Sequence, residues 1–416
     1  MKGKEIRNKG LIGEALKGRA VAFLAGCVVG EELYFASWLT NGLYKMELKT
    51  GKCIPLKIFK YEMGGRHLYG QMIFFNNSLW LMPTHMGRNI VKVDLDTLET
   101  EYFSLPDKGM KQWKNAKSVL RQYKCCHKAG KSICWLVPLD GSMMLKVDML
   151  EGQIVEVRDS DDIVEFRDSA NFIDAELAGE KIWFCPYGNN DLVIFDTVRE
   201  KFHVRKWQHE KEKFGLITSY KEWVVFLSKG AGESILMVNQ NTYEEKKIYL
   251  YLDWEEKTTL MYTTVHVVGR YLFLAPFRAH EYVIVDLESG RIQVDRSLME
   301  CKSGRYQSGI SWGSKIIYAS DMPGYPLMIH DLQENVVSFM NFWVDGMKNQ
   351  DFLEHLYQDD PEGFLDWLCQ KEGSFQEDDL PLSLYCILVK KRECAVEFSS
   401  GRENGRRIFR HIKGQD

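Results

Sequence analysis

One pattern recurs seven times along the chain and limits what the chain can fold into. Each copy has an apolar run that ends in Pro or Ser, a polar loop, and a second apolar run that ends in Asp or a substitute. The first runs end at Ser37, Pro83, Pro138, Pro186, Ser228, Pro276 and Ser320, and the second runs end at Glu47, Asp94, Asp148, Asp196, Asn239, Asp286 and Asp331. The two marks of a copy are always 10 or 11 residues apart. Successive acids are 47, 54, 48, 43, 47 and 45 residues apart, which indicates a repeat architecture.

Each unit has room for four short strands. In the second unit we expect strands at 70–75, 78–83, 89–94 and 99–104, with Asn76-Asn77 as the first hairpin turn. The second strand of a unit is apolar throughout, so both of its faces must be covered. Blades that stack face to face around a ring provide such cover.

These features predict an all-β fold, a seven-bladed β-propeller of four-stranded blades that spans residues 19–343. Six or eight blades are the alternatives for the blade number. A solenoid fits the period but not the two buried faces. Residues 1–18 form an N-terminal segment that could add an outer strand to the last blade.

The repeat stops after residue 343, and residues 344–416 are expected to form a C-terminal helical extension. Asp360-Pro361 is typical of a helix start, and Asp379 with Pro381 offers a second start. Residues 402–413 offer a third helix. Short helices of this kind bury too little surface to be stable alone, so we expect them to pack on the propeller.

Charge and hydrophobicity exclude several classes of protein. The chain has 54 Lys and Arg against 58 Asp and Glu, so a nucleic-acid binder that depends on overall positive charge is a poor interpretation. No apolar run reaches the roughly 18 residues of a membrane helix, and we expect no membrane partner.

The cysteines and the N-terminus bear on localisation. The ten cysteines have no zinc-like spacing, which favours reduced thiols in the cytoplasm. A basic N-terminus followed by an apolar stretch up to Cys27 is the argument for export instead. That apolar stretch is short, and it lies inside the first repeat, so cleavage there would destroy a blade.

The repeat resembles the kelch-like or galactose-oxidase-like propellers, in particular uncharacterised bacterial members of that group. The resemblance rests on apolar runs such as Leu79-Trp-Leu-Met-Pro83, the later Asp, and the helical tail. The sequence departs from true kelch repeats, because the double glycine occurs only at Gly64-Gly65. The motifs of the galactose oxidase copper site are absent, so no catalytic residue, metal or cofactor is carried over.

The loops that connect second and third strands should share a rim with the segments that lead into first strands. This rim surrounds the central channel and is the usual ligand face of a propeller. The candidate binding residues on it are Arg66, His67, His85, Arg88, Arg167, Asp168, Tyr187, Arg278, His280, Arg305, Tyr306 and Tyr325.

Arg66, Arg167 and Arg305 lie at roughly equivalent places, 15 to 19 residues before the Pro or Ser mark of their units. If they point inward, they form a cationic collar suited to carboxylate or phosphate. The alternative is that they are solvent-exposed or pair with local acids between blades.

Other repeated residues have a structural interpretation. The acid that ends each third strand is expected to accept backbone N–H bonds in the following turn. Trp80, Trp135 and Trp183 occupy one matched position in the doubly buried strand and are expected to lie in the core.

The function expected is therefore a propeller that presents its channel mouth to a small polar or anionic ligand, a glycan or a protein partner. The alternative is an enzyme, a lyase, hydrolase or epimerase, with His85 or His280 as general base. A third possibility is an inert propeller whose helical tail docks a partner. No complete catalytic set distinguishes these.

Overall fold

The structure is a computed structural model. It describes residues 22–37, 42–57, 59, 68–84, 87, 89–105, 123–139, 144–157, 172–186, 191–206, 209, 214–228, 234–250, 261–279, 281–296, 306–320 and 325–344. All regular elements within these ranges are β-strands. The N-terminal segment 1–18 and, apart from Val344, the helical extension expected at 344–416 lie outside the described residues. No helix among the described residues is long and apolar enough to cross a membrane.

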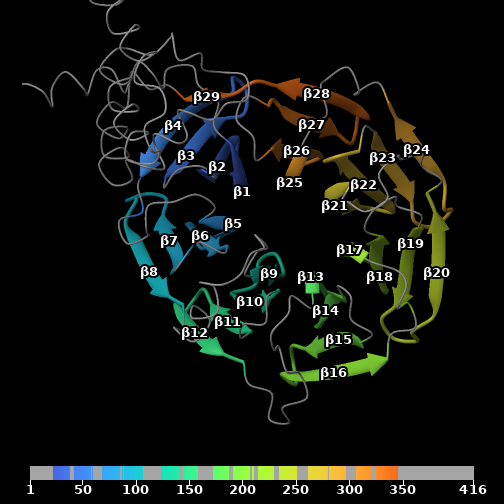
Figure 1. The fold of residues 1–416 in the computed structure, drawn as a ribbon. Helices are drawn as coiled ribbons and strands as arrows, with labels where there is room; N and C mark the ends of the chain where they lie inside the picture. The colour runs from blue at the N-terminus through green and yellow to red at the C-terminus, as the bar shows by residue number, and fades with distance from the viewer. Residues whose placement is uncertain are drawn as a thin grey trace, which may run out of the picture.

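Seven antiparallel sheets are arranged in a ring around a central axis (Figure 1). Within each sheet the strands follow one another in chain order, from the innermost strand to the outermost. The expectation of a seven-bladed β-propeller with four-stranded blades is confirmed.

The innermost strands are β1 (Phe23–Val29), β5 (Tyr69–Phe75), β9 (Tyr123–His127), β13 (Phe172–Ala178), β17 (Phe214–Tyr220), β21 (Tyr262–Val268) and β25 (Tyr306–Trp312). The second strands are β2 (Glu32–Ser37), β6 (Ser78–Pro83), β10 (Ile133–Pro138), β14 (Lys181–Pro186), β18 (Trp223–Ser228), β22 (Tyr271–Pro276) and β26 (Lys315–Ser320). The third strands are β3 (Leu43–Glu47), β7 (Asn89–Asp94), β11 (Leu145–Asp148), β15 (Asp191–Asp196), β19 (Ser234–Asn239), β23 (Tyr282–Asp286) and β27 (Leu327–Asp331). The outer strands are β4 (Lys52–Lys57), β8 (Thr100–Ser104), β12 (Gln153–Glu156), β16 (Lys201–Lys206), β20 (Glu245–Tyr249), β24 (Ile292–Asp295) and β28 (Val336–Met340), and β29 (Trp343–Val344) follows.

The second strands lie in the core, as their apolar character predicts. Every residue of β6 is buried, and β10 and β14 are buried after their first residue. Trp80, Trp135 and Trp183 are each at most 5% exposed, which confirms that they are core residues. Hydrophobic clusters join neighbouring blades, so each sheet is covered by the next one around the ring.

A second repeated feature lies at the start of each inner strand. An aromatic residue there pairs directly with the Pro or Ser that ends the second strand of the same blade. The seven aromatics are Phe23, Tyr69, Tyr123, Phe172, Phe214, Tyr262 and Tyr306, and none is more than 5% exposed. In six of the seven blades, the ladder has a bulge or irregularity directly after this residue.

The residue that ends the third strand accepts backbone N–H bonds in six of the seven units, as its position predicts. Glu47 of the first unit differs, because its side chain accepts from the Thr50 hydroxyl at 2.8 Å. Asp94 Oδ1 accepts bonds from the backbone N–H groups of Asp96 and Thr97, at 3.0 and 2.9 Å. The same two-bond turn occurs at Asp148, Asp196, Asn239, Asp286 and Asp331. Asn76 and Asn77, which have φ values of 47° and 56°, form the expected hairpin turn.

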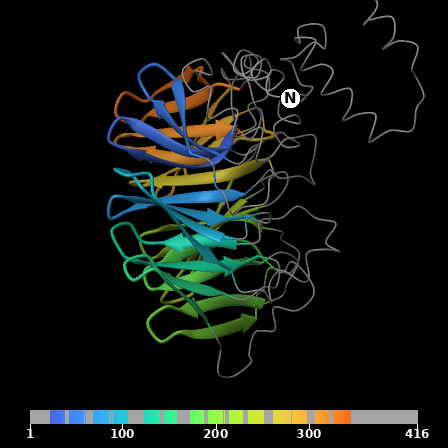
Figure 2. The ribbon, with the colours of Figure 1, turned by 90° about the vertical axis from the view of Figure 1, so that its left-hand side faces the viewer.

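The ring is closed by the chain that follows the seventh blade. β29 pairs in parallel with β4, so the first blade has five strands, and its innermost strand β1 contacts both β5 and β25. The ring of Phe342 packs against Phe23 with the ring centroids 5.8 Å apart. Figure 2 shows the ring from its side, with the first and last blades adjacent.

Gly51 lies where this closing segment meets the first blade. Its φ is +76°, and a Cβ on it would overlap the backbone of Asn341. Gly130 has the same φ, but a Cβ on it would meet nothing within 4 Å. Substitution of Gly130 thus introduces backbone strain alone, whereas substitution of Gly51 introduces the same strain and a steric conflict with the closing segment.

We predict that Gly130→Ala costs about 1–2 kcal/mol of unfolding free energy through its left-handed backbone alone. Gly51→Ala should cost at least about twice as much, because it also displaces the closing segment. Urea unfolding of both variants measures the difference. Equal losses would mean that the contact with Asn341 does not hold the ring closed.

Candidate functional site

The described main chain supports the expected rim. The backbone N–H of Thr84, directly after β6, donates to the carbonyl of Leu68, directly before β5, at 2.8 Å. Arg278 N, which follows β22, donates likewise to Met261 O at 3.0 Å. The start of a second-to-third loop therefore lies beside the start of the inner strand in these two blades.

Most of the predicted rim residues lie outside the part of the chain that the structure describes. These nine are Arg66, His67, His85, Arg88, Arg167, Asp168, Tyr187, His280 and Arg305. Arg278 is exposed, with its guanidinium 5.8 Å from the centre of the Phe277 ring. Tyr325 is partly buried.

Tyr306 belongs to the ring of buried aromatics. It is 3% exposed, and its hydroxyl donates to the carbonyl of Pro326 at 3.3 Å. Its carbonyl accepts a bond from the Thr263 hydroxyl of the neighbouring blade, at 3.1 Å. Packing therefore accounts for this side chain without a role on the rim.

A different polar set lies on the inner strands themselves. Its members are Lys124 on β9, Asp174 and Glu176 on β13, Ser219 on β17 and His266 on β21. All but Asp174 are partly exposed. These strands lie nearest the central axis, with three further strands of each blade outside them (Figure 1). We call these five residues the channel cluster.

Lys124 and Asp174 form an ion pair between the third and fourth blades. Lys124 Nζ lies 2.9 Å from Asp174 Oδ1, and the side chains are 22% and 9% exposed. The backbone N–H of Ala175 also donates to Asp174 Oδ1, at 3.0 Å. A pair this well covered costs desolvation, which these bonds offset only when both partners are present.

Glu176 lies between this ion pair and the fifth blade. The Ser219 hydroxyl donates to Glu176 Oε1 at 2.7 Å. Burial raises the pKa of Glu176 to about 7, while the Ser219 bond and the Lys124 charge oppose this rise and Asp174 adds to it. Near neutral pH, the Glu176 carboxyl is therefore present in both its protonated and its ionised form.

His266 lies on the sixth blade and packs on the seventh. Burial, with help from the Lys124 charge, lowers the pKa of His266 to about 4, and a bond with the Gly309 backbone opposes this. Its ring lies over Gly309, where a Cβ would overlap it, and its centroid is 5.8 Å from that of Tyr318. The imidazole is therefore uncharged at neutral pH.

A buried polar network lies behind His266, between the sixth and seventh blades. The hydroxyl groups of Tyr282 and Tyr318 are 3.1 Å apart, and Tyr282 Oη lies 2.8 Å from His330 Nδ1. All three residues are at most 1% exposed. The network is sealed from solvent, so its role is to join the two blades.

The cluster offers acid–base groups but no complete catalytic set. Among the described residues, no three His, Cys, Asp or Glu side chains lie close enough to hold a metal ion. Cys125 and Cys126 are buried, and the pKa values of both thiols are raised well above the ordinary value. The neighbouring Cys134 and burial raise the pKa of Cys125, and burial is the main cause at Cys126. These thiols stay protonated. The two adjacent cysteines are therefore better interpreted as buried core residues than as a redox centre.

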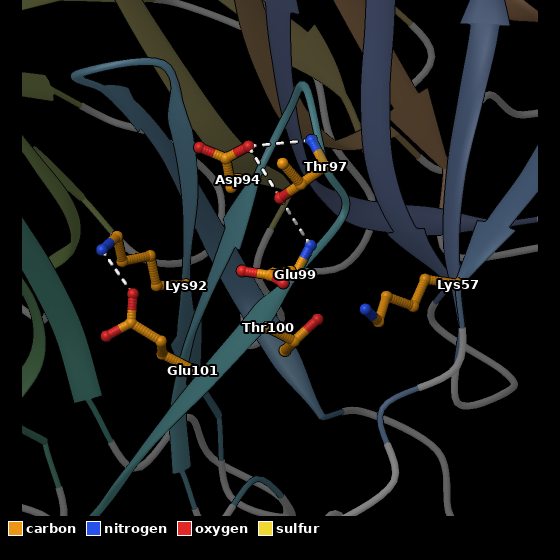
Figure 3. A pocket seen from close by; sticks show the side chains of 7 residues that line it. All are labelled: Lys57, Lys92, Asp94, Thr97, Glu99, Thr100 and Glu101. Carbon is orange, nitrogen blue, oxygen red and sulfur yellow. Dashed lines mark hydrogen bonds and ion pairs between the residues drawn. The ribbon is translucent and has the colours of Figure 1, made fainter.

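A groove of about 560 Å³ lies on the outside of the ring between the first and second blades (Figure 3). Its polar groups bind one another: Lys92 pairs with Glu101 at 2.5 Å, and Asp94 accepts from Thr97. Lys57 extends from the first blade and donates to the carbonyl of Leu98. With these groups engaged, the groove is a weaker candidate than the channel.

The channel cluster is not among the rim residues predicted from the repeats, although the repeat register offers a partial signal for it. Glu176 and His266 both lie 10 residues before the Pro of their units. The residues at this place in the other units are Cys27, Ile73, Lys128, Thr218 and Ile310. A carboxylate or imidazole thus occurs there only in the fourth and sixth units, although Lys128 and Thr218 are polar as well.

Comparison with known proteins identifies the fold alone. No family model matches the chain, and no curated protein matches it in sequence. Among solved structures, a catalytically inactive virginiamycin B lyase from Staphylococcus aureus with Quinupristin has a TM-score of 0.51 and 13% identity, over 74% of this chain and 94% of that one. YCF48 bound to D1 peptide has a TM-score of 0.52 and 7% identity, over 73% of this chain and 92% of that one. The RRP9 WD40 repeats have a TM-score of 0.50 and 11% identity, over 73% of this chain and 88% of that one. Propellers of several kinds are thus similar, so the kelch-like or galactose-oxidase-like type stays an expectation.

The raised pKa of Glu176 predicts a specific pH dependence of stability. Because the folded-state pKa of about 7 lies above the ordinary value of 4.5, the native state binds the proton more tightly between these values. The unfolding free energy should therefore fall as the pH rises from about 5 to about 8. We expect a fall on the order of 1–2 kcal/mol, less than the full pKa shift would give, because the side chain keeps some contact with solvent. Glu176→Gln should lack this component.

Urea unfolding of the natural chain and of Glu176→Gln, at about pH 5 and about pH 8, measures this component of the unfolding free energy. The lowered pKa of His266 acts in the opposite sense, with stability lost as the pH falls from about 6.5 toward 4. That contribution is common to both proteins and cancels in their difference. The same pH dependence in both proteins would contradict the assignment to Glu176.

The packing of His266 on Gly309 predicts a coupled pair. Gly309→Ala should cost about 1–3 kcal/mol of unfolding free energy, because the new methyl group must displace the imidazole. In a His266→Ala background the same change should cost well under half as much. A double-mutant cycle by denaturant unfolding gives the coupling energy, and additive losses would exclude the contact.

Proposed function

We propose that this protein is a binding propeller whose ligand occupies the central channel and its loop-side mouth. The observation that carries the proposal is the channel cluster, which collects one lysine, two carboxyl groups, a hydroxyl and an uncharged imidazole on neighbouring inner strands. Elsewhere the inner strands also carry partly exposed polar side chains, among them Gln71, Thr263 and Gln307, but these are uncharged. Partly exposed polar groups in such a wall are the feature expected of a small-molecule or peptide site.

The loop side of the proposed site consists of the rim residues predicted from the repeats. Arg66, Arg167 and Arg305 precede β5, β13 and β25 in the sequence, and β13 carries both acids of the channel cluster. We propose that these arginines bind a carboxylate or phosphate of the ligand. The remaining candidates, including Arg88, Tyr187 and Tyr325, would contact the rest of a small ligand, a glycan or a protein segment.

The similar structures are compatible with a ligand at such a site. One is a lyase with Quinupristin and another is bound to a peptide. At 13% and 7% identity they support the scaffold and leave the ligand of this chain open. The cysteines of the described residues are free thiols, which supports our proposal of a reducing, cytoplasmic environment.

An enzyme on the same scaffold is the second candidate. It is favoured by Glu176, whose pKa of about 7 suits proton transfer at neutral pH. In that case His85 or His280 on the loops, or Glu176 in the wall, would act as general base. Loss of turnover with unchanged ligand binding in Glu176→Gln would favour the enzyme over the binding protein.

A thermal-shift screen tests the proposed function. Sugars, sugar phosphates, small carboxylates and short peptides are added to the full-length protein and to an Arg66→Ala, Arg167→Ala, Arg305→Ala triple variant. A ligand that binds the native state raises the unfolding midpoint by mass action. At a ligand concentration a hundred times Kd, the unfolding free energy rises by about 2.7 kcal/mol.

We expect an anionic compound to give a shift that the triple variant loses. The Arg199→Ala variant is the control, because Arg199 lies in a described turn at the end of β15 and is exposed. No shift with any compound class, together with no protein captured by the full-length chain, would contradict the proposed function.

A further inference from the structure

The charges of the channel wall are unbalanced. Across the described inner strands, the charged side chains are Lys124, Asp174 and Glu176, and His127 and His266 are the histidines. One lysine therefore faces two carboxyl groups. His266 adds no positive charge at neutral pH, because its pKa is lowered to about 4.

The single lysine is committed to one of the two acids. Lys124 Nζ lies 2.9 Å from Asp174 Oδ1, which also accepts the Ala175 N–H at 3.0 Å. This leaves Glu176 with the Ser219 hydroxyl as its hydrogen-bond donor at Oε1. Within the part of the chain that the structure describes, no group donates to Glu176 Oε2.

Three kinds of ligand group would meet Glu176 differently. An anionic group would face both carboxylates of β13, with Lys124 already engaged. An apolar group would remove the remaining solvent from Glu176 without replacing it, which costs free energy. A cationic nitrogen would complete the coordination of Glu176 and balance the second carboxylate.

We infer that the channel binds an ammonium or guanidinium group of its ligand against Glu176, beside the Lys124–Asp174 pair and the Ser219 hydroxyl. This inference rests on the proposed function and names a chemical group that the channel itself selects. Such a group is supplied either by a free amine or by a lysine or arginine side chain of a bound peptide.

The protonation of Glu176 gives the inference a measurable signature. A carboxyl group with a pKa of about 7 is partly protonated at neutral pH, and a bound cation favours its ionised form. Binding should therefore release protons near pH 7. Affinity should fall in acid, because only the ionised fraction of the protein is competent to bind.

The test uses calorimetric titration of the full-length protein with n-butylamine and with a capped Gly-Lys-Gly peptide. n-Butanol, butyrate and a capped Gly-norleucine-Gly peptide are the matched uncharged and anionic probes. Each titration is made at about pH 8 and about pH 5.5, and in two buffers of different ionisation enthalpy. The variants are Glu176→Gln and, as control, Glu151→Gln in an exposed turn.

We expect the amine, the peptide or both to bind at least about tenfold more tightly at the higher pH. Proton release on binding should appear in the titration at about pH 5.5, where Glu176 of the free protein is mostly protonated. Glu176→Gln should lose at least about tenfold in affinity, and Glu151→Gln should match the natural chain. Binding by n-butylamine alone identifies a free amine, and binding by the peptide alone identifies a side chain. The pH comparison on the natural chain decides the matter even if Glu176→Gln folds poorly.

The inference would be overturned if butyrate bound as tightly as n-butylamine. It would also be overturned if the affinity for amines changed neither with pH nor in Glu176→Gln. If no amine binds while an anionic compound shifts the midpoint and loses that shift in the triple arginine variant, the proposed function holds and this inference fails. If nothing binds in either experiment, both fail.

Discussion

Burial of the second strand of each blade on both faces is the constraint on which the structure depends. A strand such as β6, buried along its whole length, cannot face solvent on either side. Each blade therefore needs a neighbour on both sides, and a row of such blades leaves two uncovered ends unless it closes. The parallel pairing of β29 with β4 and the contact of β1 with β25 meet that need by joining the last blade to the first.

Closure in turn decides what the inner strands can do. Their neighbours within the blade cover one edge and adjacent blades cover both faces, so the edge toward the central axis is the one that no strand of the blade covers. Polar groups there form bonds between blades: Gln71 with the backbone of Cys125, Lys124 with Asp174, Ser219 with Glu176, and Ser308 with the carbonyl of Leu24. The same groups thus hold neighbouring blades together, and these bonds fix the positions of the inner-strand side chains.

Much of this architecture could be predicted from the sequence, because its signals are local and repeated. The spacing from Pro or Ser to the acid defines the units, and the turns at Asp94 and its equivalents follow from that position. The inner-strand aromatics are equally regular, 14 residues before the mark in six units and 15 in the third. The position of Tyr306 directly after Arg305 predicts a rim residue, whereas its register matches the buried aromatics. Lys124 and Asp174 are brought together by two different blades, and β29 has no counterpart in other units, so no pattern within one unit reveals them. Most loop residues of the predicted site lie outside the described residues, so their arrangement stays a prediction.

The proposed arginine collar and the proposed cation site in the wall place opposite demands on a ligand. Glu176 is four residues into β13, or about 13 Å from the start of that strand at 3.3 Å per residue. Arg167 precedes that start in the sequence. If the collar lies at the loop-side mouth, as proposed, a ligand that uses both carries its anionic and cationic groups at different ends. An extended peptide or a long amine with an acidic end fits that requirement better than a compact zwitterion does.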